Sequence, residues 1–498
     1  MATWQPKDSD YLAIIQEQNP WHTLDRVPEE LARPNQRPLA DVLWQLLLYP
    51  PLRRHQIILG PRRVGKTTVM YQTVQMLLNN GIRSDRLWWL RLDHPLLMEI
   101  SLGVLVKLVM EAARATPSEP LILFLDEVTY AEKWDLWLKT IYDEQWPVRL
   151  VGTSSATAII RDHGTESGVG RWNELFLGPY LFSEYLVLRE MEIKKSDCAA
   201  TLGETLPLFR NVVSEQIEAA RRSFMITGGF PELVLQKTSG DEASDLFRSQ
   251  QVLRNDAIEK AIYKDIPQAF QVQDPTKLER LLYTLAGQIT GVLSPSTIGT
   301  DVALSDVSVD KYLKYLERAF IVFTLPNYSK HEESVQRRGR RVYFVDGAVR
   351  NAALLRGLAP LKSPEEIGLL LENLVAAHLF SLSQLAGVRV YHWRQGTCEV
   401  DLVYDHPSDP LAFEITGSRR HKIVGMEEFQ KRFPKFRGRC YVVSPAFSYR
   451  APKETIPGQL SLDSLLIAIG KQAAKALDSR LGVHREGVGR QMKLKFHE

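Results

Sequence analysis

Short apolar runs alternate with amphipathic stretches between residues 37 and 180. The apolar runs cover residues 56–59, 87–90, 121–125 and 149–152. Between them, the stretches 67–79 and 134–142 repeat their apolar residues at the helical period. Strands and helices therefore alternate, which predicts an α/β core over residues 37–180, a parallel sheet flanked by helices.

Helical periodicity dominates residues 181–265, where the strand pattern fades. A Gly-Gly-Phe-Pro turn at 228–231 interrupts it, so we expect a helical lid made of several helices. Residues 266–335 contain further helical patterns that end in the apolar run 320–325, and Ser294 before one of them is a helix-capping signal. This pattern favours a small helical or winged-helix-like module.

Strands and helices alternate again in residues 336–450, which predicts a second α/β domain. A long helical pattern covers residues 363–385. The strand patterns lie at 342–345, 388–391, 400–403 and 411–415. We expect residues 1–36 to form an N-terminal extension and residues 451–498 to form a C-terminal helix and tail.

The composition is that of a soluble globular protein. Of the 498 residues, 44% are hydrophobic and 24% are charged. A length prior of roughly 100–200 residues per domain suggests about three domains. The formal net charge is only +3, so any nucleic-acid partner would have to be bound by a local basic surface.

The cysteines and the termini indicate the compartment. Cys198, Cys398 and Cys440 are far apart and lack metal-ligand spacing, which is typical of a reducing compartment without disulfides. The N-terminus lacks the basic-then-apolar order of a secretory signal. No uninterrupted apolar stretch reaches the roughly 20 residues that a membrane span needs. We therefore expect a cytoplasmic protein without a membrane partner.

Residues 60–67 match the phosphate-loop pattern G-x-x-x-x-G-K-[ST] and lie between a predicted strand and a predicted helix. The glycines let the backbone curl so that its N–H groups face phosphates. Lys66 is then expected to reach the β- and γ-phosphates, and Thr67 to hold Mg²⁺. The cofactors are ATP and Mg²⁺. The expected nucleotide-binding residues are Gly60, Pro61, Arg62, Arg63, Val64, Gly65, Lys66, Thr67 and Thr68.

Two carboxylates end the apolar run 121–125. Asp126 would bind Mg²⁺ and Glu127 would polarise the attacking water. Such a pair alone is more typical of a solvated strand end. Together with the phosphate loop, the pair indicates the metal-binding and catalytic carboxylates of a nucleotide site.

Two further features are candidates for the same site. Thr153 and Ser154 end another predicted strand, where a polar side chain could sense the γ-phosphate; a loop rich in Ser and Thr is the alternative. Arg171 follows a Gly-rich loop and could stabilise transition-state charge on a neighbouring subunit's nucleotide. A surface or core-anchoring arginine is the alternative for Arg171.

Together these motifs resemble a widespread prokaryotic family of AAA+-superfamily P-loop ATPases, whose C-terminal half is an uncharacterised domain resembling PD-(D/E)xK restriction endonucleases. The resemblance covers residues 19–445. It implies a sheet order of AAA+ type, assembly into a homo-oligomer and a role for Arg171 as arginine finger, but it names neither a substrate nor a protein partner. It rests on Gly60-Pro-Arg-Arg-Val-Gly-Lys-Thr-Thr68, Leu125-Asp-Glu-Val128, Gly152-Thr-Ser-Ser155, Gly170-Arg171 and Gly228-Gly-Phe-Pro-Glu232.

The C-terminal motifs follow the same family pattern. By this resemblance Glu372, Asp401 and Glu414 correspond to the acidic cluster of the nucleases, where two carboxylates hold Mg²⁺. A lysine normally stands two residues after the last acid, but this chain has Thr416 there. Lys422 or Lys431 could replace it from a nearby segment. Without such a replacement the acids are residual groups in a structural fold, which is our leading interpretation.

Basic residues concentrate in the C-terminal half and suggest contact with DNA phosphates. The candidate DNA contacts are Arg337, Arg338, Arg340, Arg341, Arg419 and Arg420. Three functions stay open. The first is a DNA-associated ATPase that acts as a motor or clamp, for example on branched or junction DNA. The second is a nucleotide-switched scaffold that recruits protein partners. The third is an ATP-gated nuclease.

Overall fold

The computed structural model describes residues 6–50, 52–155, 170–191, 198–210, 212, 214–235, 242–331, 335, 339–417 and 423–480. The chain forms two compact units. The first contains Met1–Gly60, Gly65–Leu177 and Leu477–Glu498, and the second contains Pro61–Val64 and Gly178–Ala476. The helical lid, the small module and the C-terminal α/β domain therefore all belong to the second unit.

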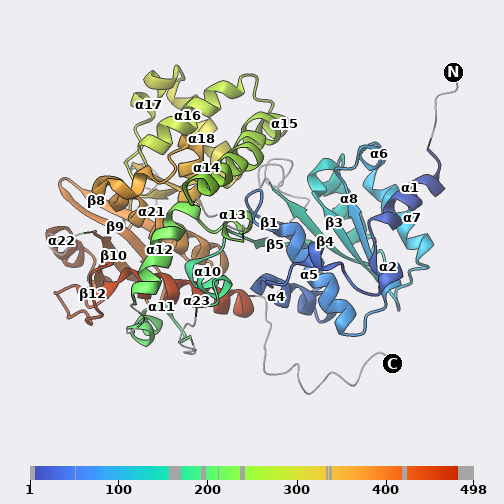
Figure 1. The fold of residues 1–498 in the computed structure, drawn as a ribbon, viewed down its shortest axis with the longest axis horizontal. Helices are drawn as coiled ribbons and strands as arrows, with labels where there is room; N and C mark the ends of the chain where they lie inside the picture. Colours follow the sequence, from blue (N-terminus) through green and yellow to red (C-terminus); the bar gives the residue numbers. More distant parts are fainter. Residues whose placement is uncertain are drawn as a thin grey trace. The chain divides into compact units, whose positions relative to one another are not determined.

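The first unit is built on a five-stranded parallel sheet with the order β2-β3-β4-β1-β5 (Figure 1). Four of the strands coincide with the apolar runs of the sequence, which confirms that prediction. The pattern did not predict β5. The strands are β1 (His55–Leu59), β2 (Leu87–Arg91), β3 (Leu121–Asp126), β4 (Val148–Ser154) and β5 (Trp172–Phe176).

Helices cover both faces of this sheet because its crossovers run in two directions (Figure 1). Along the sheet, the connection from β1 to β2 goes in one direction, and the connections from β2 to β3 and from β3 to β4 go in the opposite direction. Because crossovers between parallel strands are right-handed, the two sets of helices lie on opposite faces. Accordingly α4 (Pro38–Leu48) packs on α5 (Lys66–Asn79), while α7 (Leu102–Ala112) packs on α8 (Trp134–Asp143).

The N-terminal segment contributes to this unit, although the sequence predicted only an extension. It forms α1 (Asp8–Glu17), α2 (Trp21–Leu24) and α3 (Glu29–Ala32). The fully buried Trp21 donates its indole N–H to the backbone oxygen of Leu87, at 2.8 Å. Asn19 exchanges two hydrogen bonds with the backbone of Trp89. These contacts give hydrogen-bond partners to backbone groups of β2, an edge strand whose backbone would otherwise be unpaired on that side.

The lid is helical, as its sequence pattern predicted. An irregular helical stretch, Arg254–Asp265, continues α14 and leads into α15. The helices are α10 (Phe182–Leu188), α11 (Leu202–Thr205), α12 (Glu215–Thr227), α13 (Pro231–Val234), α14 (Glu242–Leu253) and α15 (Ile266–Phe270).

Three helices and a strand pair form the module after the lid. β6 and β7 pair antiparallel, and Val292, between the first two helices, forms an antiparallel bridge with Arg341 of β7. The three helices pack on one another, and the third also packs on β6. The elements are α16 (Pro275–Gly287), α17 (Pro295–Val302), α18 (Asp306–Arg318), β6 (Val322–Pro326) and β7 (Arg340–Phe344).

The C-terminal α/β domain has a mixed five-stranded sheet with the order β12-β11-β10-β9-β8. β8, β9 and β10 are antiparallel neighbours, whereas β10, β11 and β12 run parallel. The sequence predicted the helix and the first three strands but not the last two. The elements are α20 (Gly347–Leu354), α21 (Pro364–Ala386), β8 (Arg389–Gln395), β9 (Cys398–Asp405), β10 (Leu411–Ile415), α22 (Val424–Arg432), β11 (Cys440–Ser444), β12 (Gly458–Ser461) and α23 (Leu462–Arg480).

Helix α21 is the core helix of this domain. Among the helices of the described residues, it alone is long and apolar enough to cross a bilayer. However, 61% of its most apolar window is buried inside the protein. This burial is what the central helix of a folded domain shows.

The Gly228-Gly-Phe-Pro motif is closely packed within the second unit. Asp346 caps α20 by accepting a hydrogen bond from the backbone N–H of Ala348, and its other oxygen accepts one from Gly229, both at 2.7 Å. The Gly229 oxygen in turn accepts a bond from the Tyr180 N–H. A Cβ on Gly229 would lie 2.1 Å from the Tyr180 oxygen, so only glycine fits there.

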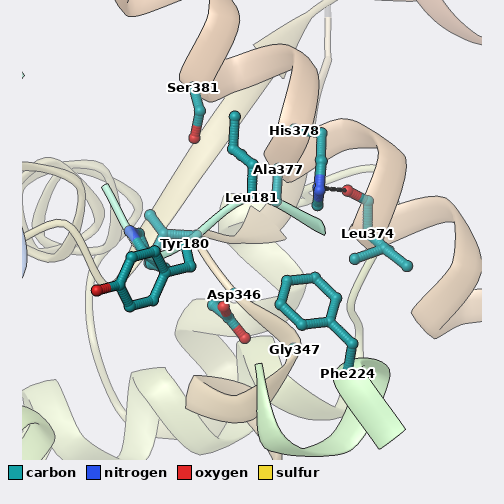
Figure 2. A pocket seen from close by; sticks show the side chains of 11 residues that line it. Tyr180, Leu181, Phe224, Asp346, Gly347, Leu374, Ala377, His378 and Ser381 are labelled. Atoms are coloured by element: carbon teal, nitrogen blue, oxygen red, sulfur yellow. Dashed lines mark hydrogen bonds between the residues drawn. The ribbon is translucent and has the colours of Figure 1, made fainter. Parts of the chain in front are cut away.

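The hollow beside this motif is lined by Asp346 and His378, whose polar atoms are hydrogen-bonded within the chain. His378 accepts a hydrogen bond from the Phe182 N–H at its Nε2, so its Nδ1 carries the proton and donates to the Leu374 oxygen (Figure 2). Burial lowers the pKa of His378 to about 4 and raises that of Asp346 to about 6. Both groups therefore hold the fold together.

Candidate nucleotide site

The phosphate loop connects β1 to α5, as the sequence predicted. Arg63 and Gly65 both have positive φ, at 67° and 89°, so the loop curls back on itself before α5 begins at Lys66. Gly65 tolerates this left-handed conformation without strain. The Lys66 side chain is buried, and its ammonium donates to the Gly60 oxygen at 3.0 Å and to the Ser155 hydroxyl at 2.9 Å. The lysine thus lies across the mouth of its own loop.

Thr67 and Asp126 form the candidate magnesium site. The Thr67 hydroxyl lies 3.1 and 3.2 Å from the two carboxylate oxygens of Asp126, which ends β3. A hydroxyl and a carboxylate are the hard oxygen donors that Mg²⁺ prefers, and Mg²⁺ at such sites takes its other ligands from water and phosphates. The two side chains therefore fit the cation that the sequence predicted.

Asp126 is held in a buried network. Its side chain accepts a hydrogen bond from the Thr153 hydroxyl at 2.7 Å. Burial and the adjacent charge of Glu127 raise the pKa of Asp126 to about 6, against the opposing effects of Thr153, Thr67 and Lys66. A nearby cation would favour the charged form, as expected of a metal-binding carboxylate.

Glu127 is positioned by its backbone and by a serine. Its φ and ψ are 53° and 55°, a left-handed conformation that is uncommon for a non-glycine residue. The Thr153 hydroxyl accepts a hydrogen bond from the Glu127 N–H at 2.9 Å, and the Ser155 hydroxyl donates to Glu127 Oε1 at 2.7 Å. Strained backbone of this kind clusters at functional sites, where the surrounding contacts impose it.

The sequence offered Thr153 and Ser154 at the end of β4 as sensor candidates. In the structure Thr153 and Ser155 reach the carboxylate pair, and the sequence analysis did not name Ser155. The role of Ser154, which is buried, stays a prediction. Successive side chains of a strand point to opposite faces, so residues two apart share a face. That alternation was the signal that would have identified Ser155.

Arg171 is paired within its own chain. It directly precedes β5, and its guanidinium donates to both carboxylate oxygens of Asp143, at 2.8 and 3.1 Å. The hydrogen bond from Arg171 lowers the pKa of Asp143, the last residue of α8. An arginine finger role would require Arg171 to leave this carboxylate.

The middle of the phosphate loop, Pro61–Val64, groups with the second unit. Within that unit Arg62 forms a bidentate ion pair with Asp265. The distances from Nε and Nη2 of Arg62 to the two carboxylate oxygens are 2.5 and 2.6 Å. Arg63 pairs with Glu232 at 2.6 Å and also with Asp256. Carboxylates of the lid therefore hold both loop arginines.

The candidate DNA contacts are placed in part. Arg337, Arg338, Arg419, Arg420 and the alternative lysine Lys422 lie outside the described residues. Arg340 pairs with Asp310 of α18. Arg341 is buried and pairs with Glu372, Glu399 and Asp401. The expectation that Arg341 contacts DNA is therefore wrong, because a phosphate contact needs an accessible cation.

The candidate nuclease residues lie on α21, β9 and β10. Glu372 and Asp401 meet around Arg341, and Glu414 and Thr416 are both buried. Lys431, the other alternative lysine, is 73% exposed and lies 3.8 Å from Glu428.

Residues 53–186 match the AAA domain family. The segment that contains the phosphate loop and the parallel sheet of the first unit is therefore similar to an AAA-type P-loop core. Residues 219–360 and 367–455 match two domains of unknown function, DUF8612 and DUF4143. The likeness of the C-terminal domain to restriction endonucleases thus remains a resemblance.

Three curated proteins that are similar to the chain are described as uncharacterised. MJ1637 of Methanocaldococcus jannaschii is 23% identical over 356 residues, which cover 70% of this chain and 72% of the relative. MJ1544 of the same organism is 21% identical over 353 residues, covering 70% and 71%. An uncharacterised protein of Haemophilus influenzae is 20% identical over 319 residues, covering 63% and 72%.

Two solved structures share 15% sequence identity with the chain. One is the Aeropyrum pernix ORC1 protein in complex with DNA, with a TM-score of 0.28 and coverage of 69% of this chain and 98% of that one. The other is AMPPCP-bound DnaA from Aquifex aeolicus, with a TM-score of 0.25 and coverage of 60% and 92%.

Proposed function

We propose that this protein binds and hydrolyses Mg²⁺-ATP in its AAA-type core and binds duplex DNA through the module of residues 266–335 together with β7. The hydrolytic part rests on one observation. Lys66, Thr67, Asp126, Glu127, Thr153 and Ser155 form a continuous hydrogen-bonded network at the mouth of the phosphate loop.

Each side chain of the network has a distinct role in hydrolysis. Thr67 and Asp126 would hold the cation, which neutralises charge on the phosphates when bound. Lys66 exchanges its contacts with Gly60 and Ser155 for phosphate oxygens. Glu127 orients and polarises the attacking water, while Ser155 holds its carboxylate in place. Preorganisation of this kind supplies most of the catalysis in phosphoryl transfer.

DNA binding is supported by the order of elements in the module. Helix, bridge strand, two further helices and a strand pair follow one another as in a winged helix, in which the third helix enters the major groove. That helix, α18, exposes Lys311 and Lys314, and Val307 is 77% exposed. In the sequence, Arg337 and Arg338 lie between β6 and β7.

A charge reversal on α18 tests the DNA role. We expect Lys311→Glu/Lys314→Glu to weaken duplex binding by at least about 10-fold and to reduce the dependence of log affinity on log salt by about 2, because each lysine neutralises about one phosphate. The measurement is fluorescence anisotropy of labelled duplex and branched DNA at several salt concentrations, together with ATP turnover with and without DNA.

The matched control is Lys362→Glu/Lys453→Glu, which changes the same charge at two other exposed lysines. Equal losses in both variants would make the effect one of net charge and remove α18 as the DNA-binding helix. Absence of DNA binding by the wild-type protein at low salt would refute the DNA role and leave the protein-recruiting switch as the better explanation.

The role of Arg171 is tested by separating it from its partner. In an oligomer with a finger acting in trans, Arg171→Ala is expected to lower kcat for ATP hydrolysis by about 10²-fold, since a charge-stabilising donor is lost. Asp143→Ala removes the same ion pair but leaves the arginine, so it should retain wild-type turnover. Equal losses in the two variants would show that Arg171 acts only through the Asp143 pair.

A further inference from the structure

Arg341 lies in the middle of the acidic cluster of the C-terminal half. One guanidinium nitrogen, Nη1, is 3.2 Å from a carboxylate oxygen of Glu372 and 3.2 Å from one of Asp401. The other terminal nitrogen, Nη2, is 2.8 Å from Glu399. The arginine side chain is only 6% exposed. A single buried cation therefore contacts three carboxylates.

Separate donors fix the two buried acids. The Tyr343 hydroxyl donates to the same Glu372 oxygen that faces Arg341, at 2.8 Å. The Ile415 N–H donates to the second oxygen of Asp401, at 2.8 Å. Burial and the charge of Asp401 raise the pKa of Glu372 to about 8, while Arg341 opposes that rise. The cluster is thus built around a positive charge that is already present.

These side chains do not fit the Mg²⁺ site that the nuclease resemblance implies. Asp401 uses one oxygen for Arg341 and the other for the backbone. Mg²⁺ demands carboxylate oxygens at about 2.0–2.1 Å in octahedral geometry, and here the oxygens converge on a guanidinium instead. Across the described residues, no group of three or more His, Cys, Asp or Glu side chains could hold a metal ion.

We infer that Arg341 takes the place of the divalent cation in this acidic cluster, so that the C-terminal domain carries a fixed internal cation and does not cleave DNA. The replacement has a structural consequence. Arg341 belongs to β7, while Glu372 and Asp401 belong to α21 and β9. Three ion pairs of Arg341 therefore connect β7, the last strand of the module, to the α/β domain.

Divalent-cation binding tests the inference directly. Mn²⁺ is added to the full-length, nucleotide-free protein, and free Mn²⁺ is measured by electron paramagnetic resonance. In the wild-type background, Asp401→Asn is expected to leave Mn²⁺ binding unchanged. Arg341→Met is expected to gain about one Mn²⁺ per chain, and Arg341→Met/Asp401→Asn to lose it again. Any Mn²⁺ held by Thr67 and Asp126 cancels in each comparison.

Removal of Arg341 leaves buried carboxylates without their partner, so the variant could fail to fold. Arg341→Met/Glu399→Gln removes the third carboxylate along with the cation, keeps Glu372 and Asp401, and should gain the same site. A wild-type Mn²⁺ site, or wild-type cleavage of plasmid DNA, that disappears in Asp401→Asn would overturn the inference. So would a folded Arg341→Met/Glu399→Gln protein that gains no Mn²⁺.

Discussion

Replacing Lys66 by alanine is expected to lower kcat/KM for ATP hydrolysis by at least about 10³-fold. The Lys66 ammonium is buried at the mouth of the phosphate loop and contacts Gly60 and Ser155, both of which belong to the site. The methyl side chain of alanine carries no charge, so it cannot stabilise the negative charge that develops on the β- and γ-phosphates. Both ATP affinity and turnover should fall, because the lysine contacts the nucleotide in the ground state and in the transition state.

The measurement is steady-state hydrolysis with nucleotide affinity determined separately by calorimetry. Lys133→Ala is the matched control, because that side chain is 69% exposed and its nearest carboxylate, on the adjacent Glu132, is 3.7 Å away. We expect it to be indistinguishable from wild type. Turnover of Lys66→Ala within threefold of wild type would show that nucleotide is not hydrolysed at this loop.

The nucleotide site was largely predictable because local spacing decides it. A phosphate loop needs a strand, eight residues and a helix in succession, and 60–67 supplies all three. Asp126 and Glu127 follow an apolar run long enough to be a buried strand. Ser155, which contacts Lys66 and Glu127, lies one residue beyond the predicted pair, which is the usual uncertainty at the end of an element.

Elements that depend on distant partners were not predictable. β5, Trp172–Phe176, mixes polar and apolar residues, and it becomes a strand because it pairs with β1 along its whole length. The N-terminal segment gives no pattern that would attach Trp21 and Asn19 to β2, some 70 residues away. Such contacts belong to tertiary structure, which local propensity does not record.

The basic residues at 337–341 are a second case in which the sequence did not reveal distant partners. As a sequence it resembles a solvated or DNA-facing surface. In the structure Arg341 and Tyr343 point from β7 toward Glu372, while the neighbouring Arg340 pairs with Asp310. Strand alternation predicts that Arg341 and Tyr343 share a face, but only the fold brings Glu372 and Asp401 to that face.

Glu127→Gln is expected to bind ATP as the wild type does and to hydrolyse it about 10³-fold more slowly, within the range attributed to general base catalysis. The amide is nearly isosteric and can still accept the Ser155 hydrogen bond, which at present holds Glu127 Oε1 at 2.7 Å. It cannot polarise water as a carboxylate does. Thr67 and Asp126 are unchanged, so Mg²⁺-ATP should remain bound.

Single-turnover hydrolysis and the dissociation rate of a fluorescent ATP analogue separate these effects. Ser155→Ala offers a graded comparison, because it keeps the carboxylate but removes its donor and one partner of Lys66. We expect its kcat to fall by about 10-fold, between wild type and Glu127→Gln, since orientation is lost but the base remains. If Glu127→Gln lost affinity and turnover in equal measure, Glu127 would be a binding group and the attacking water would need another base.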